Sequence, residues 1–342
     1  MKRFIFLMLW AVLAPFSGAD PKPLPIPLSE EGQAQFTVRV VDEAGLPVAG
    51  APVGTTTSKR SVGKEARFPT ESANVLSLSD SSGLAFFRSP SVTGKFWVGN
   101  RPSDEFYYIT KSLEFRFQQM DSDKKWQPWN PTYELTVRRK VNPVALYAKK
   151  VGFNTKPFLI PAGRKVGFDL VVGDPVGPGF RGKVADFVFE VGGTFKDSSE
   201  YDSRLTVSFS NPADGFQPFE RTWDDCEFAA PREAPESGYL TPLVLRRKSV
   251  AGQLDSERLD DTRTAKGWFF RLRTVLGADG KVERAYYAKV TGAFEFSPAR
   301  PGGSGCCFTY HFNPRANERN LEFDPKRNLN ADLTPWEQVT QP

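Results

Sequence analysis

Phe36-Thr-Val-Arg-Val-Val41, a run in which apolar and polar side chains alternate, opens the stretch of sequence that decides the fold. Such alternation predicts a strand with one buried face. An acidic turn follows at residues 42–45, and residues 47–53 (Pro-Val-Ala-Gly-Ala-Pro-Val) form a second short run. After a polar loop, Leu78-Ser-Asp-Ser-Ser-Gly-Leu-Ala-Phe-Phe87 places an Asp-x-x-Gly turn directly before a third run. Short runs joined by Gly and Asp turns predict a small β domain.

This order of features resembles the carboxypeptidase regulatory-like domain, a prealbumin-like Greek-key β-sandwich. The matching features are the turn at residues 42–45, the Pro- and Gly-containing run after it, and the Asp80-x-x-Gly83 turn. Thr132-Tyr-Glu-Leu-Thr-Val-Arg138 is expected to be the closing strand, with Tyr133 facing inward. The resemblance implies such a sandwich at residues 36–140. It implies no activity, because modules of this kind accompany many unrelated proteins.

The composition predicts an all-β chain of two domains. The chain has 342 residues, of which 39% are hydrophobic and 13% aromatic, and its 28 Gly and 28 Pro supply many turns. Its aromatic residues are concentrated in short alternating runs, which are typical of strands. We therefore expect a second, larger antiparallel β domain at residues 141–313, followed by a polar C-terminal tail at 314–342. The net charge of +5 is scattered along the chain, which argues against nucleic-acid binding.

The N-terminus has the pattern of a signal peptide at residues 1–19. Lys2 and Arg3 precede a short apolar run, and Ser17-Gly-Ala19 is a small-residue cleavage site. The run is too short to span a membrane, no later segment is long enough, and no cysteine lies near the cleavage point for lipid attachment. We expect a secreted, periplasmic or envelope-associated protein. Residues 20–35 are Pro-rich and predict an extended leader.

The second half predicts further strands. Residues 143–149, 184–191 and 204–210 alternate, a hairpin is expected for 268–275 with 282–296, and 307–312 is a final core strand. The charged stretch 231–266 is expected to loop out. Segments between residues 142 and 329, among them Pro-Val-Ala-Leu-Tyr-Ala-Lys-Lys at 143–150 and Asn-Leu-Glu-Phe-Asp-Pro-Lys-Arg-Asn-Leu at 320–329, are similar to uncharacterised exported bacterial proteins. This resemblance implies no activity.

Three cysteines, Cys226, Cys306 and Cys307, suit an oxidising compartment. A disulfide from Cys226 to either neighbour would close a long loop. A bridge between the adjacent cysteines and three free thiols are the alternatives. A metal site that adds His311 is disfavoured, because adjacent residues of a strand point to opposite faces.

Catalytic motifs are weak. His311 is the only histidine, so a Ser-His or Cys-His hydrolase must use it, and Gly302-Gly-Ser-Gly-Cys306 does not fit a nucleophile elbow. Asp121-x-Asp123 lacks the rest of a calcium loop and predicts a solvated turn. No cofactor is expected. Paired carboxylates able to act as in a glycosidase would come from acidic residues of turn-rich segments. These are Asp169, Asp174, Asp186, Glu322 and Asp324.

Trp126, Trp129 and Tyr133 are the candidate ligand-binding residues, because closely spaced rings with amides between them suit stacking of a sugar or peptide. The alternative is that these rings cap the sandwich. The sequence thus predicts an exported, non-enzymatic binding or structural protein whose ligand is a glycan, a peptide or a protein. The rival class is a carboxylate-dependent hydrolase of polysaccharide with the first domain as accessory. An open cleft with two acidic side chains in the second domain favours the hydrolase.

Overall fold

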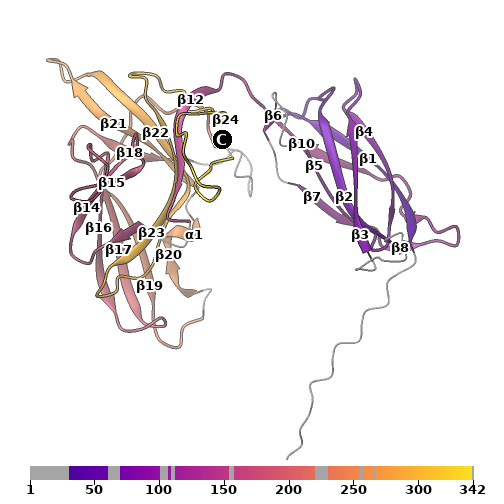
Figure 1. Cartoon of the computed structure of the whole chain (residues 1–342), viewed down its shortest axis with the longest axis horizontal. Helices are drawn as coiled ribbons and strands as arrows, with labels where there is room; N and C mark the ends of the chain where they lie inside the picture. The colour runs from indigo at the N-terminus through magenta and orange to yellow at the C-terminus, as the bar shows by residue number, and fades with distance from the viewer. Residues whose placement is uncertain are drawn as a thin grey trace, which may run out of the picture.

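A computed structural model describes residues 31–60, 70–100, 107–108, 112–153, 158–219, 230–254, 257–264 and 266–340. The predicted signal peptide, residues 20–30 of the predicted leader and Cys226 lie outside these ranges. Figure 1 shows two β lobes side by side, the N-terminal one in indigo and purple and the C-terminal one from magenta to yellow. The predicted all-β class, a smaller sandwich followed by a larger and mostly antiparallel β domain, is confirmed. The resemblance to the carboxypeptidase regulatory-like domain stays a prediction.

The first domain is a sandwich of a three-stranded and a four-stranded sheet. The first sheet has the order β10-β1-β4, with β1 (Gly32–Val41) parallel to β10 (Thr132–Thr136) and antiparallel to β4 (Leu84–Ser91). The second has the order β3-β2-β5-β7 and consists of β3 (Thr70–Leu78), β2 (Pro52–Arg60), β5 (Lys95–Asn100) and β7 (Leu113–Arg116). Two short pairs complete the domain: β6 (Tyr107–Tyr108) with β11 (Arg138–Arg139), and β8 (Gln119–Met120) with β9 (Trp126–Gln127).

The core of this sandwich forms from the alternation of its strands. Phe36 lies at its centre, with ring centroids 5.1 Å from Phe87 and 5.0 Å from both Phe96 and Phe115. β1 begins at Gly32, so the last residues of the predicted leader belong to the strand. A Cβ on Gly32 would lie 2.4 Å from the sulfur of Met120, so a larger residue there would require the Met120 side chain to move.

The second domain packs a seven-stranded sheet against a six-stranded one. The larger sheet has the order β18-β21-β22-β23-β12-β24, with β13 added beside β23. Its strands are β12 (Val144–Val151), β13 (Phe158–Ile160), β18 (Gly215–Pro218), β21 (Gly267–Leu276), β22 (Val282–Phe296), β23 (Ser304–Asn313) and β24 (Phe323–Asn328). The smaller sheet has the order β15-β14-β16-β17-β19-β20. Its strands are β14 (Lys165–Asp169), β15 (Asp174–Val176), β16 (Phe187–Phe195), β17 (Tyr201–Ser208), β19 (Leu243–Ser249) and β20 (Leu259–Asp260), and α1 (Asp261–Thr264) follows β20.

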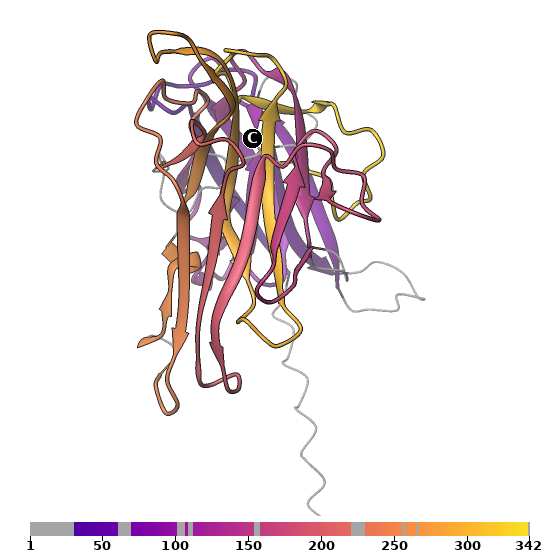
Figure 2. The same cartoon turned by 90° about the vertical axis from the view of Figure 1, so that its left-hand side faces the viewer.

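An aromatic core fills the space between these two sheets. Phe187, Phe189, Phe294 and Phe308 are completely buried and contact one another edge-on or tilted. A second apolar cluster covers the opposite face of the seven-stranded sheet. The outer face of the smaller sheet carries exposed residues such as Gly192 and Arg204, and it turns toward the viewer in Figure 2.

Two sequence predictions about this domain are wrong. Residues 314–342 are not a separate polar tail, because β24 pairs in parallel with β12, and Leu321, Phe323 and Val339 are buried. The charged stretch 231–266 does not simply loop out either. It contains β19, which pairs with β17 along its length. In both segments a few apolar residues supply the buried face although the composition is polar.

Ion pairs connect the two domains. Arg232 binds Glu43 of the first domain at 2.8 Å and Glu322 of the second at 3.1 Å, and it donates to the Arg139 carbonyl at 2.7 Å. Arg138 is buried and lies 3.3 Å from Glu43. Glu322 also accepts the backbone N–H groups of residues 141 and 142, at 2.9 and 2.6 Å. The connecting segment is thus held by charge-assisted hydrogen bonds on both sides.

Across the described ranges, no helix is long and apolar enough to cross a membrane.

Candidate functional site

The predicted tryptophan platform is not present as a pair of exposed rings. Trp126 is 7% exposed, its Nε1 donates to the Ser91 carbonyl at 2.9 Å, and it belongs to the core of the first domain. Tyr133 stacks on Phe115 with 3.8 Å between ring centroids, and burial raises its pKa. Trp129 is half-buried, with the Lys125 ammonium 5.7 Å from its ring. Trp126 and Tyr133 therefore pack against the sandwich, as in the alternative given above.

Neither of the two cysteines in the described ranges forms the predicted disulfide, since Cys306 and Cys307 are both free thiols. Cys306 lies in the core between the sheets, and burial raises the pKa of its thiol. The Cys307 Sγ donates to the Gly152 carbonyl at 3.1 Å. Adjacent residues of β23 point to opposite faces, so the two thiols do not meet. Cys226, the third cysteine, lies outside the described residues.

Two of the candidate carboxylates hold loops in place. Asp169 accepts four backbone N–H groups, at 2.9 to 3.2 Å, and its pKa is lowered because these bonds outweigh desolvation. Asp186 is completely buried and takes two hydrogen bonds from Arg273, at 2.7 and 2.9 Å. Desolvation raises the pKa of Asp186 despite this partner. The arrangement ties turns together at one end of the sandwich and leaves neither carboxylate open to a substrate.

The other candidates have structural surroundings too. Glu322 and Asp324 lie at the domain junction, where Asp324 pairs with Lys140 at 3.3 Å. Asp174 accepts the backbone N–H of residue 181 at 2.9 Å. Asp121 accepts two backbone N–H groups of its own turn, as predicted for a solvated turn, and no group of metal-ligating side chains occurs in the described part of the chain. His311 is fully buried against Phe323 and is closed to a substrate.

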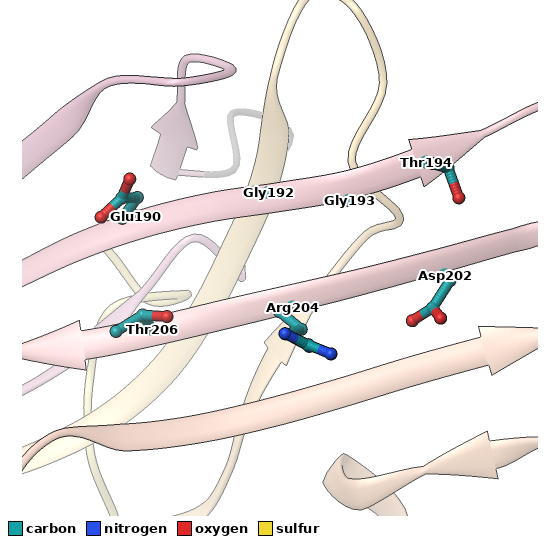
Figure 3. Close-up of a pocket in the computed structure, with 7 residues that line it drawn as sticks. All are labelled: Glu190, Gly192, Gly193, Thr194, Asp202, Arg204 and Thr206. Carbon is teal, nitrogen blue, oxygen red and sulfur yellow. The ribbon is translucent and has the colours of Figure 1, made fainter.

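A polar depression on the open face of the smaller sheet is the strongest candidate site. It is formed by neighbouring strands β16 and β17 and has a volume of about 490 Å³. We call it the polar groove, and Figure 3 shows its lining residues. They are Glu190, Gly192, Gly193 and Thr194 from β16 and Asp202, Arg204 and Thr206 from β17.

A pair of glycines makes this groove. Gly192 lies directly opposite Arg204, and a Cβ built on Gly192 would meet no atom within 4 Å. The missing side chain therefore leaves open space on β16 opposite Arg204. Gly193 has φ +131°, and a Cβ there would lie 2.1 Å from the Asp202 carbonyl oxygen. Position 193 thus requires glycine for the close approach of the two backbones.

The groove has a surplus of positive charge. The Asp202 carboxylate takes two hydrogen bonds from Arg246 of β19, one of them at 2.8 Å, and these bonds lower its pKa. Glu190 lies 3.8 Å from the Lys165 ammonium of β14. Arg204 is exposed and forms no hydrogen bond or ion pair with any residue that the structure describes. The charge of Arg204 contributes to the lowered pKa of Asp202, but its guanidinium donates no hydrogen bond to a described residue and can therefore receive an anion.

The two acids of the groove are too far apart for glycosidase chemistry. Glu190 faces Thr206 across the strands, and Asp202 is four residues further along β17. Four residues of a strand span about 13 Å, whereas glycosidase carboxyl groups lie roughly 5 to 9.5 Å apart. The lowered pKa of Asp202 also keeps this group ionised, the opposite of a general acid.

The sequence held one signal for this site. Two adjacent glycines follow the alternating run that predicts β16, and glycine inside a strand marks close backbone approach or missing side-chain volume. Their partner Arg204 is identified only by the register of β16 with β17, which the sequence does not show.

Comparison with known proteins adds little. No protein-family model matches the chain, and no curated protein matches it. Among solved structures, it is similar to the major pilin SpaD from Corynebacterium diphtheriae, with 12% identity, a TM-score of 0.25, and coverage of 89% of this chain and 86% of the pilin. A variant of the shaft pilin SpaA from Lactobacillus rhamnosus GG matches with 11% identity, a TM-score of 0.20, and coverage of 54% and 90%. At such TM-scores these likenesses carry no argument about function.

Proposed function

We propose that this chain is an exported, non-enzymatic protein that binds an acidic, hydroxyl-rich polysaccharide in the polar groove. The observation that carries the proposal is the exposed Arg204 guanidinium, which has no ion pair within 4.0 Å among the described residues and belongs to the residue paired with Gly192, where the lining has open space. Export rests on the signal-peptide pattern of residues 1–19.

The lining suits a uronate-bearing glycan. A guanidinium forms paired hydrogen bonds with a carboxylate, which gives geometric specificity as well as attraction. The hydroxyl groups of Thr194 and Thr206 and the carboxylate of Glu190 lie around it and can bond sugar hydroxyls. The groove is open along a sheet face, so a polymer can lie across it without an end having to enter.

The hydrolase alternative has one observation in its favour, since the groove holds two acidic side chains. The distance between Glu190 and Asp202 along the paired strands and the ionised state of Asp202 support a binding protein instead of a hydrolase. A binding protein is expected to leave the length of the polymer unchanged during incubation.

The test uses polygalacturonate and alginate as acidic probes and dextran as a neutral one, with affinity measured by calorimetry. Arg204→Gln is expected to weaken acidic-probe binding about tenfold, because it removes the charge and keeps a polar side chain. Gly192→Phe is expected to abolish binding, because its ring occupies the groove without a backbone clash.

Gly302→Phe is the matched control for the filled groove. A Cβ on Gly302 also meets no atom within 4 Å, and this residue lies in a turn and does not line the groove. It is expected to bind like the unmodified protein. Equal binding by the Gly192→Phe and Gly302→Phe variants, or no binding of either acidic polymer by the unmodified protein, contradicts the proposal. Shortened polymer chains after incubation would support the hydrolase.

A further inference from the structure

The outer face of the four-stranded sheet in the first domain carries an exposed tryptophan that the sequence analysis did not single out. Trp97 of β5 is 39% exposed, whereas its neighbours Phe96 and Val98 are completely buried. The ring borders a second depression, with a volume of about 230 Å³. We call this depression the Trp97 subsite, and the lining residues that carry the argument are Gly54, Thr56, Asn74, Trp97, Gly99 and Ser112.

The indole of Trp97 is held in place by charged neighbours. Its Nε1 donates to Glu114 Oε2 at 2.8 Å. The Lys95 ammonium lies 4.6 Å from the ring centroid and 2.5 Å from Glu114 Oε1. Lys95 and Glu114 neutralise each other, so the fixed ring contributes an apolar surface without net charge. Holding the ring in advance reduces the ordering cost of binding.

On one side of the Trp97 ring, the described parts of β2 and β5 place no side chain. Lys95, Trp97 and Gly99 point to the same face of β5, because alternate residues of a strand share a face. Lys95 lies over the ring from one side. On the other side Gly99 is paired with Gly54 of β2, so neither strand supplies a side chain there. The gap between these glycines gives a flat ligand access to the ring.

The remaining lining is polar and uncharged. Thr56 Oγ1 donates to Asn74 Oδ1 at 2.7 Å, which fixes the amide and directs its N–H₂ group away from Thr56. Ser112 adds a hydroxyl near Gly99. Flat apolar contact bordered by an amide and hydroxyls suits a sugar ring better than an apolar peptide side chain. The volume is below the roughly 300–1,000 Å³ of pockets for drug-sized ligands, so it suits a single ring.

We propose that the Trp97 subsite binds a neutral pyranose ring, which stacks on the side of the indole opposite Lys95. This site is independent of the polar groove, because it lies in the other domain and takes an uncharged ligand.

Binding is measured by calorimetric titration of the protein with five neutral oligosaccharides: cellohexaose, maltohexaose, xylohexaose, mannohexaose and chitohexaose. At least one probe is expected to bind. Trp97→Ala is expected to weaken that binding at least tenfold, and Trp97→Phe only a fewfold because it keeps an aromatic face. Gly99→Val is expected to block the ring, since the only contact of its Cβ below 3.4 Å is the Ser112 hydroxyl at 3.1 Å.

Trp336→Ala is the control, since Trp336 is 69% exposed and lies outside this subsite. It is expected to leave binding of the neutral sugar unchanged. Gly192→Phe is expected to leave this binding unchanged too, so the result for the Trp97 subsite is independent of the result for the polar groove. The proposal is overturned if none of the five sugars binds, or if Trp97→Ala and Gly99→Val bind as the unmodified protein does. Displacement of the bound sugar by an uncharged apolar peptide would assign the ring to peptide binding and also overturn it.

Discussion

Among single residues, Lys289 of β22 is the most unusual. Its side chain is 1% exposed, and the nearby charges are those of Arg138, Glu322 and Arg232. Desolvation, and next the nearby charge of Arg138, lower its pKa to about 7. An unfolded lysine titrates near 10.4, so between about pH 7 and pH 10.4 the unfolded chain binds more protons than the folded one. The free energy of unfolding therefore rises with pH across this window.

Lys289→Met is expected to stabilise the protein. The lowered pKa corresponds to a cost of about 4 kcal/mol at pH 7, and methionine fills a similar volume without a charge. We expect a gain of about 2–4 kcal/mol in the free energy of unfolding at pH 7, and a weaker dependence on pH between 7 and 10. Urea denaturation at several pH values measures both. Lys248→Met, at an exposed position, is the control. A loss of stability in Lys289→Met would show that the amine has a stabilising role.

Among the elements, β16 depends on its two glycines in opposite ways. Gly193→Ala is expected to destabilise the second domain by about 1–3 kcal/mol, because of its positive φ and the 2.1 Å approach of the Cβ to the Asp202 carbonyl oxygen. Gly192→Ala meets no atom and is expected to be neutral or stabilising by about 0.5–1 kcal/mol. Chemical denaturation of the matched pair tests this difference. Equal stability of the two variants would contradict this expectation, because it would mean that β17 can shift away from the new methyl group at position 193 at little cost.

The same scale shows what the sequence could predict. Alternation correctly placed the hairpin at 268–275 and 282–296, which the structure has as β21 (Gly267–Leu276) and β22 (Val282–Phe296). It did not identify β19, because only Leu243 and Leu245 mark the buried face of a charged strand. The candidate binding role of Trp126 followed from its close spacing with Trp129. Its ring is buried because Gly94, distant in sequence, leaves room for it, and such long-range contacts do not show in local sequence.

For the whole molecule, the junction determines whether the domains move together. Arg232→Ala removes contacts to Glu43, Glu322 and the backbone of Arg139. Glu322 keeps its two backbone donors, so we expect both domains to stay folded while the connecting segment opens. Trypsin cleavage after Arg139 or Lys140 is expected to become about tenfold faster, a change in the population of the open form worth about 1.4 kcal/mol.

Arg181→Ala serves as the control for that experiment, because its ion pair with Asp174 is 75% exposed on the arginine side and lies within one domain. Such a surface pair contributes little. Unchanged cleavage in Arg232→Ala would mean that the remaining contacts hold the segment without the arginine.

The parallel pairing of β1 with β10 and of β12 with β24 has a mechanical consequence. In the second domain the first strand lies beside the last one and runs in the same direction, and in the first domain β1 has the same relation to β10, the last strand of the two main sheets. Tension applied between the two ends of a domain therefore pulls these neighbours past each other along their length. The hydrogen bonds between them are then loaded at the same time, in shear geometry, and do not break one after another from one end. Domains built in this way are suited to resist stretching between their two ends.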